Sequence, residues 1–514
     1  MTGIIIAALL ITFLFYISIG VFLGIRTKNV ADMLPISTKT MAQVKSSGEF
    51  SASTVATTIS LATVILAFFE LAEYFGLWLF WSVITTSAGL LLVRIFARRI
   101  WAMISTYDHR PTLNEFLGTE FDSKTVCFVG AICTSLGFLS AFALELIVGS
   151  AFFAGLVPNV KPLSVLVILS LAVFIYTTTG GFRAVIVNDR IQMISIWLML
   201  LVLPSFYIYY IIINGGWAKG IENVPQGVLS LSNREGLIAF LAGIFVINVP
   251  TYLSDMSIWQ RIAGTHKEQT VLKGLLRSVF SAAVSWTLII LLACFAFMII
   301  RKDDHTNPLI LLIREIGKGN GLFAGVVLFF VVVGLYGAML STASTLLIAV
   351  SHTLYEDVLS KIRKRSLEER IVSKKELNIS RVILIFSAIV STAAVYILWQ
   401  KGFTIADLVF AIYGAQLGLC PLALAALLLK RERLKKLSRW AVAAISAGFI
   451  TGWGTAIYGN FAAKINFVYL PPVISLVISS LIILIGLIVT SGKPEKTENG
   501  STSLRRDHHG ERGR

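Results

Sequence analysis

Long apolar stretches run through the whole chain, separated by short polar or basic segments. Nearly all of them reach the ~20 residues that a helix needs to cross ~30 Å of hydrocarbon. Thirteen such spans have the approximate limits 3–24, 50–75, 77–97, 126–156, 163–182, 190–213, 236–256, 276–300, 322–352, 381–399, 404–429, 438–458 and 468–490. The pattern predicts an all-α polytopic membrane protein with about 13 transmembrane helices.

Domain organisation follows from the same pattern. No long polar insert interrupts the spans, so we expect a single transmembrane domain over residues 1–490. Residues 491–514 form a polar tail, which we expect to be disordered. The first span has no basic start and no small-residue cleavage site, so we interpret it as a retained helix rather than a signal peptide.

Composition narrows the function classes. Of 514 residues, 56% are apolar and 14% are charged, and the mean hydropathy is +0.81. Soluble domains carry about 25% charged residues, so a soluble enzyme and a nucleic-acid-binding domain are excluded. The sequence contains no HExxH, GxSxG, P-loop or dinucleotide-binding motif, and we expect no enzymatic activity. The four cysteines lie inside apolar stretches without CxxC spacing, which is typical of small core residues.

The basic residues indicate the orientation of the spans. The chain has 44 Lys and Arg and 28 Asp and Glu, for a net charge of +16. If the N-terminus lies outside, 34 basic residues fall in cytoplasmic segments and 9 in outer ones. Cytoplasmic loops collect Lys and Arg, so the split predicts an outer N-terminus and a cytoplasmic C-terminus in the cell membrane. The basic runs 361–365 and 430–433 are interpreted as topology determinants, with anionic lipid headgroups as secondary partners.

The second span is unusually rich in hydroxyl side chains. Seven of the thirteen residues from Ser51 to Thr63 are Ser or Thr. Hydroxyls compete for backbone hydrogen bonds and weaken a helix, so this span could be broken near its middle. A break at membrane depth survives where it lines a cavity, and its freed carbonyls are natural Na⁺ ligands. The alternative is a Ser/Thr-rich seam between packed helices.

The ninth span carries a second hydroxyl-rich segment, 337–345. Its small and hydroxyl residues recur at helical spacing and share one face, namely Ala338, Ser341, Thr342 and Thr345, with Ser344 beside them. Such a face offers neutral oxygen ligands to an alkali cation. Close helix packing explains it equally well.

Acidic residues within spans form a third set. Glu70 and Glu145 lie deep, and either could bind a cation, relay a proton or pair with a base such as Arg94. Asp189 and Asp255 lie nearer the span ends, where a solvated helix end is the alternative.

Four segments together resemble the sodium:solute symporter family. The first is Gly24–Met33, similar to the family's first cytoplasmic loop, and the second is Tyr176–Val185 followed by Asp189, Ile191 and Gln192. The third is Trp259–Gly264, which begins Trp-Gln-Arg, and the fourth is the Ser/Thr-rich helix from Ala338 to Asp357. Their order and spacing cover most of the chain, roughly 24 to 430.

The resemblance implies a LeuT-like core over about 50–429, in which spans 2–6 and 7–11 are inverted five-helix repeats. It further implies a main Na⁺ site formed by the carbonyls of Ala56, Ile59 and Ala338 and the hydroxyls of Ser341 and Thr342. A possible second Na⁺ site would use Asp189, Ser341, Ser344 and Thr345. Solute-binding positions would be Thr58, Ser60, Thr63 and Glu145. Thr58, Glu145 and the stretch 66–70 depart from the family's usual pattern, so the resemblance does not identify the solute.

Secondary active transport is the resulting prediction. Na⁺, as the coupling ion, would drive uptake of a small polar or charged organic solute by alternating access, without an obligate protein partner. Two alternatives stay open at this point. One is proton coupling through Glu70 or Glu145, and the other is a transporter-fold sensor that signals through a partner.

Overall fold

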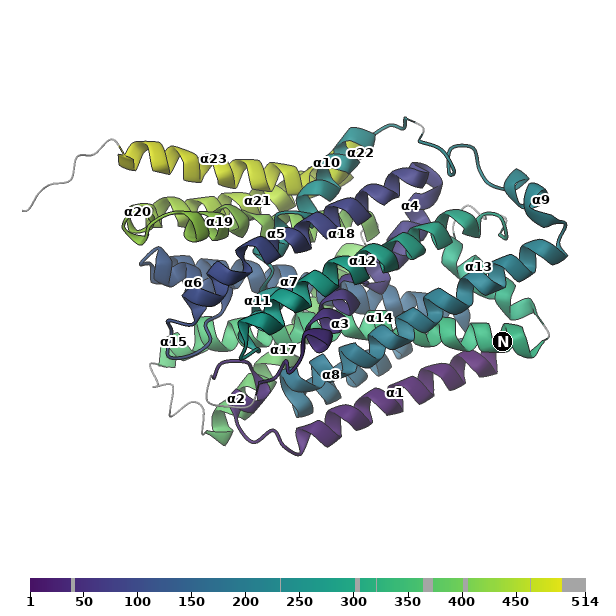
Figure 1. Ribbon diagram of the computed structural model, residues 1–514, viewed down its shortest axis with the longest axis horizontal. Coiled ribbons are helices and arrows are strands. Elements are labelled where there is room, and N and C mark those ends of the chain that lie inside the picture. Colours follow the sequence, from purple (N-terminus) through teal and green to yellow (C-terminus); the bar gives the residue numbers. More distant parts are fainter. Residues whose placement is uncertain are drawn as a thin grey trace, which may run out of the picture.

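The computed structural model describes residues 1–37, 42–231, 233–300, 306–319, 321–363, 373–400, 405–462 and 464–491. Over these ranges the regular secondary structure is helical, without a strand (Figure 1). The tail that we expect to be disordered lies outside the described residues, apart from Ser491. The fold class predicted from the apolar pattern is confirmed.

Within the described ranges, eleven helices are long and apolar enough to cross a membrane. They comprise α1 (Thr2–Gly24), α4 (Ala67–Phe75) with α5 (Phe80–Ile104), α7 (Lys124–Leu156), α8 (Pro162–Ile213), α10 (Leu237–Asn248) with α11 (Met256–Ala263), α12 (Glu268–Ala296), α14 (Leu322–Thr353), α17 (Lys374–Gln400), α18 (Ile405–Gln416) with α19 (Cys420–Leu428), α21 (Ser438–Phe461) and α23 (Pro471–Ser491). Shorter helices join them: α2 (Val30–Met33), α6 (Leu113–Glu120), α9 (Gly216–Glu222), α13 (Pro308–Lys318), α15 (Ser360–Arg363), α20 (Arg431–Lys436) and α22 (Ile465–Tyr469). Two of the eleven contain a chain reversal, which gives the thirteen crossings that were predicted.

The first reversal lies inside the 52-residue α8, at Gly181. This glycine has φ 60° and ψ −157°, and a Cβ there would lie 2.7 Å from the Met33 Cα. Residues on both sides of it contact the same part of α14. The Tyr176 hydroxyl donates to the Leu340 carbonyl at 3.1 Å, while Ser341 Oγ donates to Asp189 Oδ1 at 2.8 Å. A straight helix would separate these contacts by about 20 Å at 1.5 Å per residue, so the chain folds back into two antiparallel spans.

The second reversal lies at Gly76, which has φ 49°. Before it run α3 (Ser47–Thr58) and α4, and after it runs α5. Arg277 of α12 donates to Ser47 at the start of α3, and Glu268 of α12 pairs with Arg98 of α5 at 3.4 Å. Both partners belong to the first turns of α12, so α5 returns along the path of α3 and α4.

A second broken span was not predicted from the sequence. The seventh span consists of α10, a 3₁₀ turn over Thr251–Leu253, and α11. Pro250 lies between them and cannot donate a backbone hydrogen bond, which interrupts the helix. Each five-helix half of the core therefore begins with a broken helix.

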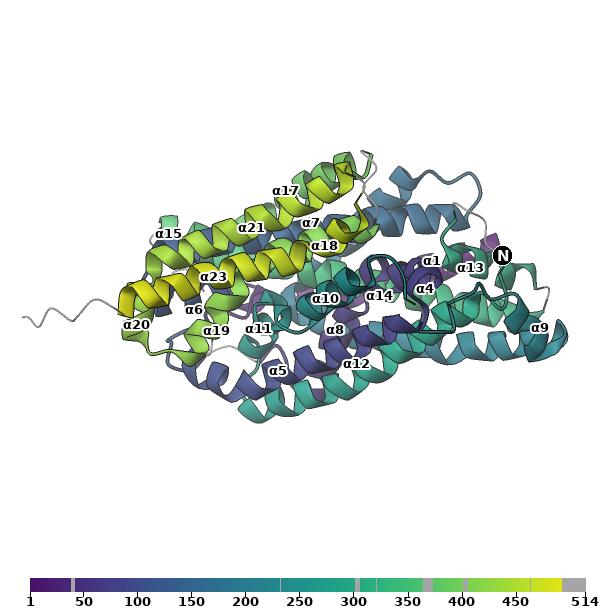
Figure 2. The same ribbon diagram turned by 90° about the horizontal axis from the view of Figure 1, so that it is seen from above.

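The helices form one bundle whose long elements run roughly parallel to its longest axis (Figures 1 and 2). The N-terminus and the last turn of α23 lie at opposite ends, as an odd number of crossings requires. α7, α14 and the span of α18 with α19 are the most enclosed, whereas α1 and α23 lie at the periphery and expose many large apolar side chains. Exposed apolar surface of this extent is expected where helices face lipid.

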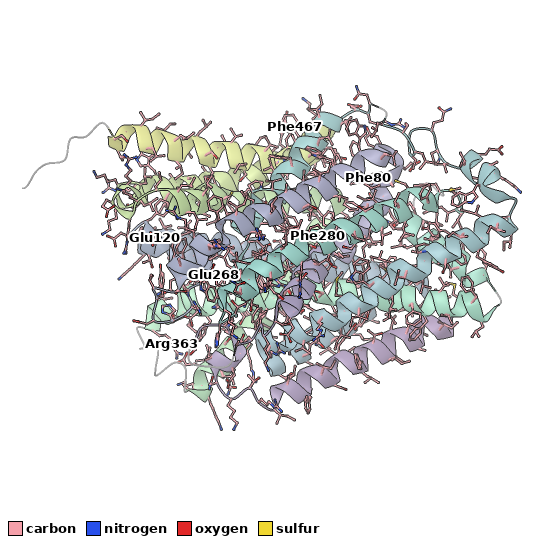
Figure 3. All side chains as sticks on the ribbon, in the orientation of Figure 1. Phe80, Glu120, Glu268, Phe280, Arg363 and Phe467 are labelled. Atoms are coloured by element: carbon pink, nitrogen blue, oxygen red, sulfur yellow. The ribbon has the colours of Figure 1, made fainter. Side chains whose placement is uncertain are left out.

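One end of the bundle carries a network of charged side chains around α6. The Glu115 carboxylate pairs with His109 Nε2 at 2.8 Å and with Lys361 of α15. Burial acts to raise the pKa of Glu115, but the hydrogen bonds and charges of these two partners outweigh it and lower the pKa to about 2. Charged residues labelled in Figure 3 (Glu120, Glu268 and Arg363) lie toward this same end.

Candidate functional site

The predicted break in the second span is present. α3 ends at Thr58, and Ile59 (φ −94°, ψ 69°) and Ser60 (φ −70°, ψ 144°) leave the helical conformation before a π-helical turn, Leu61–Leu66. Ile59 N donates to the carbonyls of Val55 and Ala56 and so closes the last turn of α3. The alternative interpretation, an unbroken Ser/Thr-rich seam, is therefore wrong.

Glu145 of α7 fixes the second half of this broken helix. Its buried carboxylate accepts from Ser60 Oγ at 2.5 Å, from Leu61 N at 2.8 Å and from Ala62 N at 3.2 Å. Free backbone amides at a helix start attract a negative charge, so the carboxylate stabilises this conformation. The sequence placed Ser60 and Glu145 with the solute, whereas the structure places both at the helix break.

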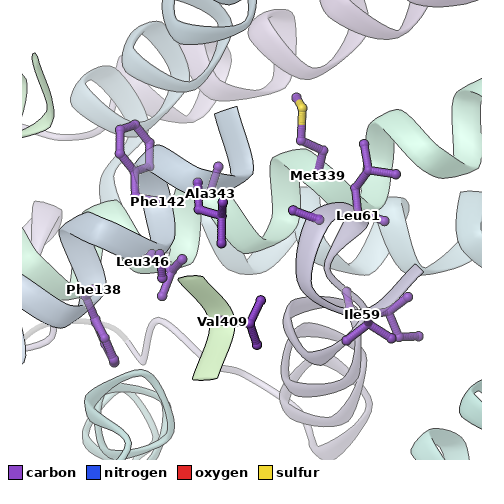
Figure 4. Close-up of a cluster of buried hydrophobic side chains, with 14 of the residues drawn as sticks. Ile59, Leu61, Phe138, Phe142, Met339, Ala343, Leu346 and Val409 are labelled. Atoms are coloured by element: carbon purple, nitrogen blue, oxygen red, sulfur yellow. The ribbon is translucent and has the colours of Figure 1, made fainter. Parts of the chain in front are cut away.

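Apolar side chains enclose the break on the other sides. Ile59 lies in the break and Leu61 follows it, and Met339 of α14 and Val409 of α18 belong to the same cluster of buried apolar side chains (Figure 4). Ile59, Leu61 and Met339 are fully buried. Backbone oxygens that the break releases therefore have few competing water molecules.

α14 meets the break through Thr342. Its hydroxyl lies 3.1 Å from the Thr57 carbonyl oxygen and 3.3 Å from the Ala338 carbonyl oxygen, and the side chain is 3% exposed. Thus the structure brings Thr342 and the Ala338 carbonyl beside the turn that contains Ala56 and Ile59. Ser341, expected in the same group, points its hydroxyl to Asp189 instead.

Asp189 is the centre of a second buried polar group. Its fully buried carboxylate accepts from Ser53 Oγ at 2.5 Å, from Ser341 Oγ at 2.8 Å and from Thr345 Oγ1 at 3.5 Å. The alternative of a solvated helix end is therefore wrong. Ser344, the fourth predicted member, donates to the Ser341 carbonyl at 3.2 Å rather than to the carboxylate.

A basic side chain completes this second group. The Arg261 guanidinium of α11 is 1% exposed, and its Nη2 lies 3.6 Å from Asp189 Oδ2. Arg261 Nη2 also donates to Thr57 Oγ1 at 2.6 Å and to Thr345 Oγ1 at 3.1 Å. The buried guanidinium thus shares the oxygens of Asp189 and Thr345 that were expected to hold a second Na⁺.

Sequence reasoning missed this role of Arg261 and the contribution of Ser53. The Trp-Gln-Arg motif indicated Arg261 only as part of a loop after the seventh span. Arg261 Nε donates to Ser53 Oγ at 2.8 Å, 208 residues away in the chain. A buried guanidinium needs a carboxylate partner. The acidic residue Asp189 within a span was therefore the feature of the sequence that could have indicated a buried basic partner such as Arg261.

A cavity of about 110 Å³ lies between the two broken helices. Both halves of the core contribute hydroxyl, amide and aromatic side chains to its wall: Thr54, Thr57, Thr58, Thr63, Phe68, Phe138, Asn248, Thr251, Tyr252, Asp255, Ser257, Arg261, Trp286, Thr342 and Tyr413. Thr58 and Thr63, two predicted solute-binding residues, are among them. Ser60 and Glu145 do not line this cavity.

Thirteen crossings, a broken first helix in each half of the core and a cavity between the breaks define a LeuT-fold secondary transporter. The chain belongs to the sodium:solute symporter family, whose model matches residues 49–433. This match covers the Asp189 group, the residues predicted for the main Na⁺ site, and the cavity.

Three relatives illustrate the similarity. The high-affinity proline transporter PutP of Bacillus subtilis (strain 168) is 25% identical over 302 residues, which is 57% of this chain and 59% of that protein, under two thirds of its length. The substrate-bound outward-open state of a Na⁺-coupled sialic acid symporter has a TM-score of 0.74 at 18% identity, covering 95% of this chain and 97% of that one. Mhp1, a nucleobase-cation-symport-1 family transporter, has a TM-score of 0.54 at 13% identity, covering 90% and 96%. At these identities the solved structures show the fold alone.

Proposed function

We propose that this transporter couples the entry of Na⁺ to the uptake of a small polar or charged organic solute by alternating access. The observation that carries the proposal is the approach of Thr342 to the turn before the broken helix. Its hydroxyl and the carbonyls of Ala56, Ile59 and Ala338 are neutral oxygens, which suit an alkali cation at a helix break. Na⁺ would take the place of the hydrogen bond between Thr342 and the Thr57 carbonyl, with both oxygens as ligands and the hydroxyl proton turned away from the ion.

The Asp189 group takes a different role in this proposal. A Na⁺ there would compete with the Arg261 guanidinium, because two positive charges in a buried site repel each other strongly. Na⁺ would therefore reach Asp189, Ser341 and Thr345 only when Arg261 moves away. We propose that Na⁺ passes this group on its way to the cytoplasm, and that only the main site holds Na⁺ in the solute-loaded state.

Proton coupling receives less support from the geometry. The Glu145 carboxylate is engaged by two backbone amides and a hydroxyl at the break, and it does not line the cavity. Glu70 is exposed on α4 and does not line the cavity. No observation on the described residues favours a sensor role.

The positive-inside asymmetry supports the proposed orientation, with the N-terminus outside and the tail in the cytoplasm. The network of Glu115 and Lys361 would then lie at the cytoplasmic end. Anionic lipid headgroups are the proposed partners of the basic segments on that side.

Proteoliposomes provide the test of the coupling ion. Purified protein is reconstituted with a Na⁺ gradient, a proton gradient or neither, and uptake is measured over a panel of radiolabelled small solutes. Accumulation that needs the Na⁺ gradient is expected. Accumulation with the proton gradient alone would contradict the proposal.

A further inference from the structure

Asp255 is an acidic residue in the wall of the cavity. It lies in the second break, immediately before α11, and its Oδ1 accepts from Ser257 N at 2.7 Å. This bond is a helix N-cap, which Asn or Ser would provide equally well. A cap alone therefore does not require the negative charge that Asp255 brings to the cavity.

The charge of Asp255 has no ion-pair partner among the described residues. Arg261 is the basic side chain that lines the cavity, and its field reaches Asp255. Its donors, however, are directed to the oxygens of the Asp189 group and of α3. Asp189 and Arg261 form a neutral pair at 3.6 Å. The part-buried carboxylate of Asp255 is then the unpaired acidic group of the cavity wall, and a positive group on a bound molecule would compensate it.

Aromatic side chains form much of the remaining wall. Phe68 and Trp286 lie edge to face, with ring centroids 5.4 Å apart, and Tyr252 and Tyr413 belong to the same wall. The Asp255 carboxylate lines the same cavity as these aromatic side chains. Aromatic faces attract organic cations, because the ring quadrupole is negative above the plane.

Trp286 adds an unused hydrogen-bond donor. Its indole Nε1 is buried and has no hydrogen-bond partner among the described residues. A buried donor without a partner costs free energy, which an acceptor on a bound molecule would recover. The cavity wall therefore combines a carboxylate with aromatic faces, and a tryptophan of this wall carries an N–H donor without a protein partner among the described residues.

We propose that the transported solute is a compact organic ammonium compound, whose positive group pairs with Asp255 and packs against the aromatic wall. A carboxylate or hydroxyl oxygen of the same molecule accepts from Trp286. The inference rests on the proposed function, because it takes this cavity as the solute site. The solute is small, since the cavity of about 110 Å³ admits few heavy atoms.

Matched probes that differ only in the positive charge test this inference. The pairs are choline and 3,3-dimethylbutanol, glycine betaine and 3,3-dimethylbutanoate, and proline and cyclopentanecarboxylate. Stabilisation of the full-length protein in nanodiscs is titrated with each probe in Na⁺ buffer. At least one ammonium member is expected to act at a tenfold lower concentration than the counterpart that lacks the positive charge. Equal action within every pair, or no action by any ammonium member, would overturn the proposal.

Two variants separate the charge from the helix cap and from the indole donor. Asp255→Asn keeps an N-cap but removes the charge, so it should abolish the tenfold preference while the melting temperature without probe changes little. Trp286→Phe keeps an aromatic face but removes the N–H donor, so it should weaken both members of each pair, which all carry an oxygen acceptor, and leave the preference for the ammonium member in place. A preference that persists in Asp255→Asn would overturn the role of Asp255.

The proposed coupling ion is tested separately in the same samples. A Na⁺ titration without any probe reports the Thr342 site, which Asp255→Asn leaves intact. If Na⁺ stabilises the wild-type protein but the ammonium preference is missing, the solute inference fails and the Na⁺ proposal survives. If Na⁺ has no effect at all, the Na⁺ proposal fails whatever the probes do.

Discussion

The most direct test of the Na⁺ site is the removal of one oxygen. Thr342→Val replaces the hydroxyl with a methyl group of nearly the same size and leaves the Thr57 and Ala338 carbonyls without this partner. Loss of one polar partner in a buried site costs about 1–3 kcal/mol. Since 1.4 kcal/mol is tenfold, Na⁺ affinity should fall about 5- to 150-fold. Thr342→Ser retains the oxygen and should remain near the wild-type affinity.

Na⁺ titration of the melting temperature, with K⁺ keeping the ionic strength constant, measures this difference. Thr177→Val is the matched control, because Thr177 is equally buried but its hydroxyl donates at 2.6 Å to Val173 of its own helix. The control should leave the Na⁺ dependence unchanged even if it lowers stability. Identical Na⁺ dependence in Thr342→Val and Thr342→Ser would show that this oxygen binds no ion.

Three further predictions concern the rest of the molecule. Lys219→Cys and Lys435→Cys should be labelled by an impermeant maleimide from opposite sides of the membrane, and labelling from one side would contradict the topology. Asp189→Asn leaves the buried Arg261 guanidinium unpaired and should lower the free energy of unfolding by about 3–5 kcal/mol. Adding Arg261→Gln should restore part of this loss. A double variant as unstable as Asp189→Asn would refute the ion pair. Because the folded-state pKa of Glu115 is lowered to about 2, its contribution to stability is present above about pH 4.5 and lost as the pH falls toward 2. Glu115→Gln should therefore melt below wild type at pH 7, with a difference that shrinks below pH 4.5.

The crossings could be predicted from the sequence because apolar length is a local property. The limits 3–24, 126–156 and 322–352 differ by at most two residues from α1, α7 and α14. The sixth span was different, since it was expected to begin near residue 190 but continues back to Gly181. Arg183 explains the difference, because Glu49 neutralises it with two hydrogen bonds of 2.7 and 2.8 Å. A hydropathy pattern counts Arg183 as a charged residue that ends a span, because the pattern contains no information about the distant Glu49 that neutralises it.

Only those parts of the candidate site that depend on local sequence could be predicted. Local hydroxyl content indicated a break near the middle of the second span, which the structure places at Ile59 and Ser60, and helical spacing indicated the face that contains Thr342. The partners of Asp189 and Glu145 depend on how four helices meet, which no local pattern encodes. Glu145 therefore appeared as a solute ligand, although its carboxylate accepts from the backbone of the broken helix.

One turn of α3 connects the proposed ion site, the ion pair and the cavity. The Thr57 carbonyl accepts a hydrogen bond from Thr342, and the Thr57 hydroxyl accepts one from Arg261. The side chain of Thr57 also lines the cavity, together with Thr58. Na⁺ between Thr342 and this carbonyl would hold α14 against α3 more firmly than the hydrogen bond of 3.1 Å does. The position of Thr57 and Thr58 in the cavity wall would become fixed at the same time, and solute binding would then cost less ordering entropy. Binding of the ion and binding of the solute would thus favour each other through a single helical turn, which is the thermodynamic requirement for coupled transport.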